Sequence, residues 1–239
     1  MVKVALVQFD SVPEKGKRNL RKMEELAERA RKLGARWIVF HECTVTDYTP
    51  KVRELAENVP HGPSTRFMID IAKRQGSVLS YGLIETEGRR YYITQAFVSP
   101  SGFEYRYRKT WLWRSETDEG FRNEWARFDP GPGPQLFTID GRKATCFICA
   151  DGSAPRCIER ARLLGPDVVF YPNNRGSLPS HEVLGDLARR IGAPMLVTNR
   201  VGASWNTRCQ GGCAAYSKEG RVLAEANRDG EEEILLGEI

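Results

Sequence analysis

The alternation of strand and helix signals limits the possible folds of this 239-residue chain more than any other feature of its sequence. Residues 2–9 are apolar on both faces of an extended segment, which is typical of a buried central strand. Residues 17–33 then place apolar side chains at helical spacing, and residues 36–41 form a second apolar strand. A strand, a helix and a strand within about forty residues predict a right-handed crossover between neighbours in a parallel or mixed sheet.

The remainder of the chain combines hairpins with further helices. Helices are expected at residues 65–75, 155–164 and 181–191. Strands are expected at residues 77–84, 91–98, 103–108, 136–139, 143–148, 167–171, 195–198, 213–217, 222–225 and 234–239. About a dozen short strands are too many for a doubly wound sheet, and four helices are too few for an eight-fold barrel. Two sheets packed face to face with helices outside therefore fit best. No linker or composition break is visible, which predicts a single domain over residues 1–239.

Composition excludes several classes of protein. Apolar residues make up 41% of the chain, which is enough for a substantial core and sets aside intrinsic disorder. The 36 Lys and Arg against 31 Asp and Glu leave a formal charge of only +5 with both signs interleaved, so neither nucleic acid nor a membrane surface is an expected partner. The amino terminus does not resemble a secretion signal and no apolar run has membrane-spanning length. The chain is therefore expected in the cytoplasm, with its six cysteines reduced.

Three chemically reactive residues each follow a predicted strand: Glu42, Lys109 and Cys149. Ligands gather at the carboxyl ends of strands in sheet proteins with helical crossovers, so these side chains can converge although they are distant in sequence. A cysteine attacks as a thiolate, a buried carboxylate can accept its proton, and a lysine can stabilise negative charge on the substrate. Taken alone, a cysteine at the end of an apolar strand is most often a buried core residue, and a charged residue there usually faces water. Together they predict a nucleophilic site.

The segments around these residues resemble signature segments of a known family. Residues 40–42 (FHE), 107–112 (YRKTWL) and 147–151 (FICAD) are similar, in order and spacing, to the three signature segments of the carbon-nitrogen hydrolase, or nitrilase, superfamily. Further family landmarks are similar to residues 4–10 (VALVQFD), 164–172 (LGPDVVFYP), 199–202 (NRVG) and 220–224 (GRVLA). The resemblance thus extends over nearly the whole chain.

This resemblance implies a four-layer α-β-β-α sandwich of two mixed sheets with helices outside, in a homodimer or larger homo-oligomer. It implies that Cys149 is the nucleophile, Glu42 the general base and Lys109 the stabiliser of the tetrahedral intermediate, and that Glu124 is a second glutamate in the site. The implied reaction converts a small amide to a carboxylic acid and ammonia through a cysteine thioester, without a metal or organic cofactor. N-carbamoyl amines and nitriles are alternative substrates for the same mechanism.

Three further residues are expected to contact the substrate. Ala150 stands where many family members have an aromatic residue, which would widen the pocket, and its backbone amide is expected to help hold the developing negative charge. Trp111 stands where the family often has histidine and would narrow the pocket elsewhere. Asn173 follows another predicted strand, as do Asn174 and Arg175, although a plain turn is the alternative at this position.

Two other interpretations remain open at this point. Cys146 and Cys149 have C-x-x-C spacing, and with Cys209 and Cys213 they could form a four-thiolate zinc site. On a strand, however, residues three apart project to opposite faces, which disfavours a shared metal ion. The chain could also be a binding or regulatory protein that keeps the scaffold without catalysis, because the presence of the residues does not establish their geometry.

Overall fold

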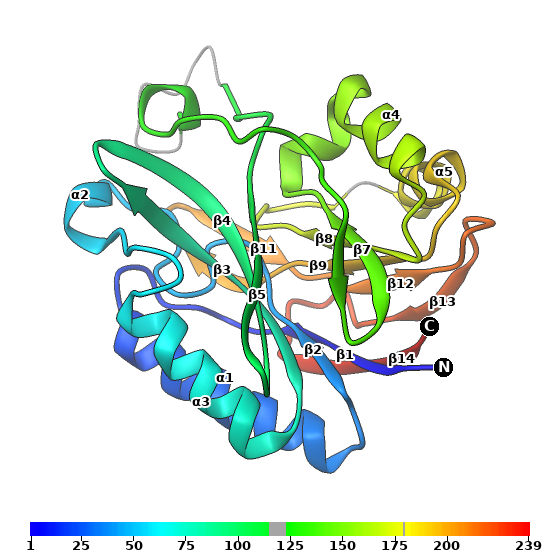
Figure 1. The fold of residues 1–239 in the computed structure, drawn as a ribbon, viewed down its shortest axis with the longest axis horizontal. Coiled ribbons are helices and arrows are strands. Elements are labelled where there is room, and N and C mark those ends of the chain that lie inside the picture. The colour runs from blue at the N-terminus through cyan, green and yellow to red at the C-terminus, as the bar shows by residue number, and fades with distance from the viewer. Residues whose placement is uncertain (115–122, 179) are drawn as a thin grey trace.

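The computed structural model describes residues 1–114, 123–178 and 180–239, and two six-stranded sheets dominate them (Figure 1). The first sheet consists, in spatial order, of β14 (Glu233–Glu238), β1 (Lys3–Gln8), β2 (Trp37–Val39), β3 (Val78–Glu87), β4 (Arg90–Ser99) and β5 (Gly102–Arg108). The second consists of β13 (Val222–Glu225), β12 (Ala214–Tyr216), β9 (Met195–Thr198), β8 (Val168–Pro172), β7 (Arg142–Cys146) and β6 (Phe137–Ile139). A separate hairpin pairs β10 (Val201–Ser204) with β11 (Thr207–Gln210).

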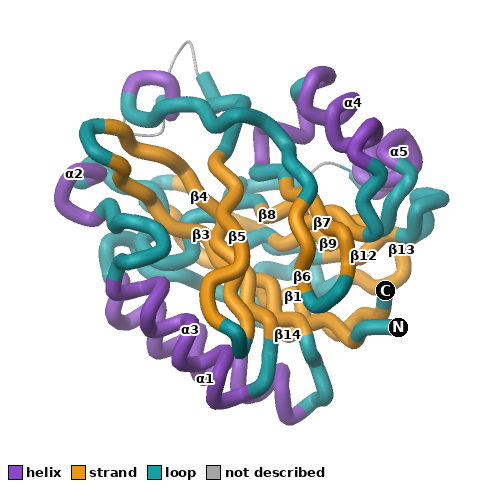
Figure 2. The backbone as a smooth tube through the Cα atoms, in the orientation of Figure 1, coloured by secondary structure: helices purple, strands orange, loops and turns teal. Residues whose placement is uncertain are grey.

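Helices cover the outer face of each sheet (Figure 2). The first sheet carries α1 (Gly16–Lys32) and α3 (Pro63–Gln75), and the second carries α4 (Pro155–Leu164) and α5 (His181–Ile191). Three short elements lie in the connections, namely α2 (Val52–Leu55) and the 3₁₀ helices η1 (Glu124–Ala126) and η2 (Cys149–Ser153). The layers therefore follow the order helix, sheet, sheet, helix, which confirms the predicted α-β-β-α sandwich.

Three hydrophobic cores separate the four layers. The core between the sheets includes Trp37 and Phe97 from the first sheet and Phe170 from the second. The ring centroids of Trp37 and Phe170 are 5.6 Å apart, and those of Phe97 and Phe170 are 5.0 Å apart. The other two cores lie between a sheet and its helices. Both faces of each sheet are thus apolar, which explains why the central strands appear in the sequence as continuous apolar runs.

Local sequence signals explain where the helices begin and end. The buried face of α1 contains Met23, Leu26, Ala27 and Ala30, a spacing that places all four on one side of the helix. Proline occupies the first turn of α3, where its missing N–H costs no hydrogen bond. Gly76 ends α3 with φ of 63°, a left-handed conformation that glycine adopts without steric penalty. No helix in the described ranges has both the length and the apolar character that crossing a membrane requires.

Strand direction brings several strand ends to one edge of each sheet. β2 is parallel to β3, β3 is antiparallel to β4, and β4 is antiparallel to β5, so β2 and β5 run in the same direction. In the second sheet, β7, β8 and β9 are mutually parallel. The carboxyl ends of β2 and β5 therefore lie at the same edge of the first sheet, and those of β7 and β8 at the same edge of the second.

The structure corrects parts of the predicted element list. The hairpin β10–β11 and the short helix α2 were not predicted. The strand expected at residues 36–41 is limited to Trp37–Val39, and the strand expected at residues 143–148 ends at Cys146. Both strands stop early because the chain turns out of the sheet to form the loops that carry Glu42 and Cys149.

Candidate active site

Four predicted site residues lie just beyond strands of the two sheets. Glu42 lies three residues after β2, Lys109 directly follows β5, and Cys149 lies three residues after β7. Asn173 directly follows β8, and its carbonyl oxygen accepts a hydrogen bond from the backbone N–H of Glu42 at 3.3 Å. This bond joins the first sheet to the second at the strand ends. The topology thus brings segments separated by more than a hundred residues to one place.

The side chains of Glu42, Lys109 and Glu124 form a buried cluster. The Lys109 Nζ lies 2.8 Å from Oε1 of Glu42 and 2.7 Å from Oε1 of Glu124, and the side chains of Glu42 and Lys109 are fully buried. The hydroxyl of Tyr48 lies 2.8 Å and 2.6 Å from the same two carboxylate oxygens. The backbone N–H of Trp113 donates to the other oxygen of Glu124 at 2.6 Å. Lys109 is therefore the cation shared by two carboxyl groups.

Burial and neighbouring charges act in opposite directions on the pKa values of Glu42 and Lys109. Burial raises the pKa of Glu42; the charge of Lys109 opposes this rise and the charge of Glu124 adds to it. Burial alone would lower the pKa of Lys109, but the charges of Glu124 and Glu42 outweigh it and raise this pKa. The ammonium group of Lys109 therefore persists between the two carboxyl groups.

The loop that carries Cys149 is held by Asp151. The backbone of Cys149 has φ of 46°, a left-handed conformation that is uncommon for a residue with a side chain. The buried carboxylate of Asp151 accepts four hydrogen bonds, from the backbone N–H groups of Ile148, Thr110 and Trp111 and from the hydroxyl of Tyr107. These donors tie the loop after β7 to the loop after β5. Asp151 therefore positions Cys149 relative to the segment that carries Lys109.

The thiol of Cys149 lies among charged groups. Burial and the charge of Glu42 raise the pKa of Cys149, whereas Lys109 and Arg175 lower it. The Nη2 of Arg175 lies 3.2 Å from Sγ. Cys149 is partly exposed, whereas the other five cysteines are buried. Among the cysteines, Cys149 therefore combines partial exposure of the residue with the contact between its sulfur and Arg175.

The predicted substrate contacts differ in their surroundings. Ala150 is buried directly beside Cys149. Asn173 is fully buried, and its Nδ2 donates to the carbonyl of Tyr171 at 2.8 Å, while its Oδ1 has no partner among the described residues. The indole of Trp111 is 52% exposed, and its backbone N–H contacts Asp151 at 2.6 Å. At Trp111, it is therefore the backbone that contacts the core of the site.

The close packing of β3 against the Glu42 segment requires glycine at position 82. A Cβ at Gly82 would lie 2.2 Å from the backbone nitrogen of Cys43 and 2.7 Å from the carbonyl carbon of Glu42. His41, also in this segment, is fully buried, and burial lowers its pKa to about 3, so its ring is neutral. The backbone that presents Glu42 is thus fixed by contacts with an apolar, tightly packed strand.

Comparison with known proteins identifies the family. The model of the carbon-nitrogen hydrolase family matches residues 3–239. The chain belongs to the carbon-nitrogen hydrolase family. It is 30% identical to a nitrilase from Pyrococcus abyssi over 100% of this chain and 90% of that protein. It is 28% identical to an (R)-stereoselective amidase from Pseudomonas sp. over 80% of this chain and 69% of that protein.

Solved structures confirm the fold of this carbon-nitrogen hydrolase. A mutant of the amidase from Nesterenkonia sp. AN1 superimposes with a TM-score of 0.88 at 22% identity, covering 100% of this chain and 93% of that one. In that structure acrylamide has added to the active-site cysteine of the amidase by Michael addition. As a member of this family, the chain is an amidase-like carbon-nitrogen hydrolase. Its fold is the sandwich seen in the solved structure of the amidase.

The zinc interpretation is not supported by the structure. Within residues 1–114, 123–178 and 180–239, no three His, Cys, Asp or Glu side chains form a group that could hold a metal ion. Cys146 Sγ contacts the carbonyl of Phe147, and Cys213 Sγ contacts the backbone of Asn199. These thiols therefore make separate local contacts and do not form the four-thiolate set predicted as an alternative.

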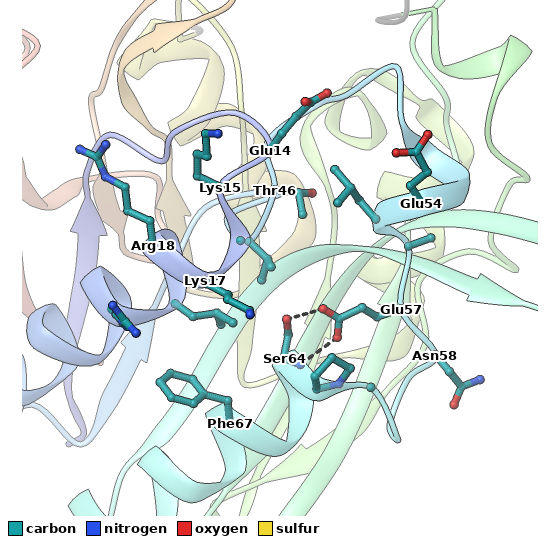
Figure 3. Close-up of a pocket in the computed structure, with 18 residues that line it drawn as sticks. Glu14, Lys15, Lys17, Arg18, Thr46, Glu54, Glu57, Asn58, Ser64 and Phe67 are labelled. Carbon is teal, nitrogen blue, oxygen red and sulfur yellow. Dashed lines mark hydrogen bonds between the residues drawn. The ribbon is translucent and has the colours of Figure 1, made fainter.

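A surface groove of about 1160 Å³ lies elsewhere, between the amino-terminal ends of α1 and α3 (Figure 3). Lys15, Lys17 and Arg18 line the α1 side. On the α3 side, the carboxylate of Glu57 accepts hydrogen bonds from the backbone N–H and the hydroxyl of Ser64 and so caps the helix. None of the candidate catalytic side chains lines this groove. It is therefore separate from the site described above.

Sequence reasoning missed Tyr48 and gave Asp151 no role beyond its place in the segment 147–151. Both are buried polar residues with several hydrogen bonds to site segments. Tyr48 lies six residues after Glu42 in a segment without helical or strand periodicity, so its polarity and its proximity to Glu42 were the only available signals. Arg175 was predicted to lie at a strand end, but its contact with Sγ was not predicted.

Proposed function

We propose that this chain hydrolyses the carbon–nitrogen bond of small, non-peptide amides and releases a carboxylic acid and ammonia through a thioester on Cys149. One observation supports the proposal above all others. Cys149, a partly exposed residue, has its thiol within electrostatic range of the buried cluster of Glu42, Lys109 and Glu124. This arrangement combines a nucleophile, a proton acceptor and a fixed cation, which are the groups that acyl transfer requires.

In the first half-reaction, Glu42 accepts the thiol proton as Sγ attacks the amide carbon and the S–C bond forms. The Oε2 of Glu42 suits this role because it is buried without a partner among the described residues, whereas Oε1 is held by Lys109 and Tyr48. Lys109 and the backbone N–H of Ala150 stabilise the oxyanion. The intermediate collapses as the C–N bond breaks, and the proton held by Glu42 passes to the departing nitrogen, so that ammonia leaves.

In the second half-reaction, a water molecule gives a proton to Glu42 and its oxygen attacks the thioester carbon. The C–S bond breaks, the proton returns to sulfur, and the carboxylic acid is released. Glu124 and Tyr48 keep Lys109 and Glu42 in place through both steps, because they contact these groups directly. One carboxylate therefore serves as the base in both half-reactions.

Nitriles and N-carbamoyl amines are alternative substrates of the same thioester route. The relatives named above include a nitrilase as well as an amidase, which keeps nitriles in view beside amides. Discrimination among these substrates depends on a few polar contacts around the acyl group rather than on the nucleophile.

A substrate panel tests the proposed function. Purified protein is incubated with small aliphatic amides, N-carbamoyl amines and nitriles, and ammonia release is measured before and after treatment with iodoacetamide. We expect amides to react fastest and activity to fall in proportion to the labelling of Cys149 measured by mass spectrometry, because the other five thiols are buried. Full activity after complete labelling of Cys149, or no ammonia from any class, would contradict the proposal.

Replacing Tyr48 with phenylalanine is expected to move the acidic limb of the kcat/KM profile to higher pH. The hydroxyl of Tyr48 hydrogen-bonds to Glu42 and lowers the pKa of that carboxyl group. Without it, the pKa of Glu42 rises further, so the proton-accepting form is lost at a higher pH as the solution is acidified. The profile is measured by ammonia release, with Tyr105→Phe as a matched control, because its phenol contacts Gln135 away from the cluster. An unchanged acidic limb would show that Tyr48 does not act on Glu42.

A further inference from the structure

Two side chains of the loop that follows β2 contact the same cation. Oε1 of Glu42 lies 2.8 Å from Nζ of Lys109, and the hydroxyl of Tyr48 lies 3.4 Å from it. Between Glu42 and Tyr48 the backbone is left-handed at Cys43, with φ of 52°, and at Asp47, with φ of 57°. This conformation is uncommon for residues that have a side chain. The shape of the loop therefore determines whether the hydroxyl of Tyr48 reaches the carboxyl group of Glu42.

The carboxylate of Asp47 is fully buried in this loop and accepts hydrogen bonds at both oxygens. Its Oδ1 accepts from the backbone N–H of Tyr48 at 2.8 Å and from Nδ2 of Asn174 at 2.7 Å. Its Oδ2 accepts from Nη1 of Arg200. The same Nδ2 of Asn174 lies 3.3 Å from the carbonyl oxygen of Glu42. Asp47 therefore connects both ends of the loop to residues that come just after β8 and β9.

The guanidinium group of Arg200 is fully buried and holds Asp47 from the second sheet. Its Nη2 donates to the carboxylate of Asp10 at 2.6 Å and to the carbonyl groups of Ser11 and Ala203 at 2.8 Å and 3.0 Å. A buried ion pair adds little net stability, because both charges lose their hydration, but its direct contacts fix one geometry. The arrangement therefore suits a positioning role for Asp47.

A second contact holds Tyr48 from the hairpin β10–β11. Trp205 lies in the turn of this hairpin, and its Nε1 donates to the carbonyl oxygen of Tyr48 at 2.8 Å. The backbone N–H of Tyr48 is held by Asp47. Both polar groups of this backbone are thus fixed by residues that do not belong to the buried cluster around Lys109.

We propose that Asp47, held by Arg200 and assisted by Trp205, is a positioning residue that fixes Tyr48 so that its hydroxyl donates to Glu42. This inference rests on the proposed role of Glu42 as the proton acceptor. Asp47 acts through Tyr48 and makes no contact with the substrate in this scheme.

The proposal predicts the sign of a pKa change. The hydrogen bond from Tyr48 lowers the pKa of Glu42, so misplacing the hydroxyl raises this pKa. Direct loss of the negative charge at Asp47 would instead lower the pKa of Glu42. The titratable and charged groups that act on Glu42 are Lys109, Glu124, Tyr48, Cys43, Cys149 and Arg175. Replacing Asp47 leaves all of them in the chain, so the direction of the change distinguishes positioning from direct electrostatics.

The pH dependence of kcat/KM for a small amide tests this role. Asparagine tolerates the left-handed backbone at Asp47, but its single acceptor oxygen cannot meet donors on both sides. In Asp47→Asn we expect the acidic limb to move to higher pH and kcat to fall about 10-fold, with a smaller change in KM. The limb should not move further when Asp47→Asn is added to Tyr48→Phe, because the hydroxyl is already absent.

Asp140→Asn is the matched control. Asp140 also pairs with an arginine, Arg36, and accepts from the indole of Trp37 at 3.0 Å, but it lies in the turn between β6 and β7. We expect its acidic limb to stay at the wild-type pH. A shift in Asp140→Asn equal to that in Asp47→Asn would show a general effect of losing such a pair and would overturn the proposal.

Trp205→Phe keeps the test decisive if Asp47→Asn does not fold. Trp205 is 40% exposed, and phenylalanine keeps a ring without the N–H donor. We expect a smaller shift of the acidic limb to higher pH, and no shift when Trp205→Phe is combined with Tyr48→Phe. An acidic limb that stays in place in the folded variants, moves to lower pH, or moves equally with and without the Tyr48 hydroxyl would overturn the proposal.

Alkylation of Cys149 separates this proposal from the proposed hydrolysis. If the wild type releases no ammonia from any substrate class, the proposed function fails, but the rate of iodoacetamide labelling against pH still depends on proton transfer from the thiol to Glu42. We then expect the acidic limb of labelling to lie at higher pH in Asp47→Asn and Tyr48→Phe than in the wild type, with no further shift in the double variant. Identical labelling profiles in the wild type and Asp47→Asn would overturn the positioning role.

Discussion

Replacing Cys149 with alanine is expected to lower kcat for amide hydrolysis by at least about 10⁴-fold, because the variant has no atom that can form the thioester. Ammonia release at saturating substrate measures the effect. The partners of the loop are unchanged in this variant, since Asp151 still accepts its four hydrogen bonds and Tyr171 still donates to the carbonyl of residue 149 at the distance of 2.7 Å seen in the structure. Thermal unfolding should therefore shift by only a few degrees, about the range of a surface substitution.

A variant at a second cysteine is the control that distinguishes loss of the nucleophile from loss of stability. Cys157 lies in α4, where its thiol is buried in the core between that helix and the second sheet. Cys157→Ala is expected to lower stability by about 1 kcal/mol through a small cavity while retaining most of the activity. Activity of Cys149→Ala within about tenfold of the wild type would exclude covalent catalysis by this residue, whatever its stability.

The sequence predicted the fold well where apolar residues follow a clear period. The central strands and the four long helices bury continuous or regularly spaced apolar side chains, so their positions could be identified from single residues and spacing. The hairpin β10–β11 offers no such signal. Only Cys209 is buried among the four residues of β11, and the strand is held by backbone pairing with β10. Its formation depends on neighbours that the local sequence does not identify.

Some residues of the candidate site could likewise be predicted from the sequence, and others could not. Glu42, Lys109 and Cys149 could be predicted because each follows a strand, and parallel strands bring their carboxyl ends to one edge. Tyr48 and Asp151 could not, because their roles depend on partners far along the chain. Tyr48 contacts Glu124 across 76 positions, and Asp151 contacts the segment after β5 across 40. A polar residue that is buried by tertiary contacts has the same local sequence signal as one in a solvated turn.

Replacing Lys109 with methionine should affect stability and catalysis together. Lys109 is the one described cation that contacts both buried carboxyl groups of the cluster. Methionine fills similar space without a charge, so the buried carboxyl groups of Glu42 and Glu124 lose their counterion. Breaking a buried ion pair from one side costs about 3–5 kcal/mol, which urea denaturation measures directly. The expected loss in kcat is about 10²- to 10³-fold, because the oxyanion loses one fixed donor. Lys143→Met, at an exposed position on β7, is the control.

A double variant distinguishes the two roles of this lysine. In Lys109→Met/Glu124→Gln one of the two carboxylates becomes neutral, so the excess negative charge that destabilises the single variant is removed. We expect part of the lost free energy of unfolding to return, with a coupling energy of about 1–3 kcal/mol between the two positions. Catalysis should not return, since the amide of glutamine does not supply a cation where the oxyanion forms. If the double variant regained activity as well as stability, the role of Lys109 would be to neutralise the carboxylates, and charge stabilisation of the intermediate would have to come from other groups. If it regained neither, unpaired negative charge on the carboxyl groups would not be the cause of the instability of the single variant, and the proposed ion-pair role of Lys109 would be wrong.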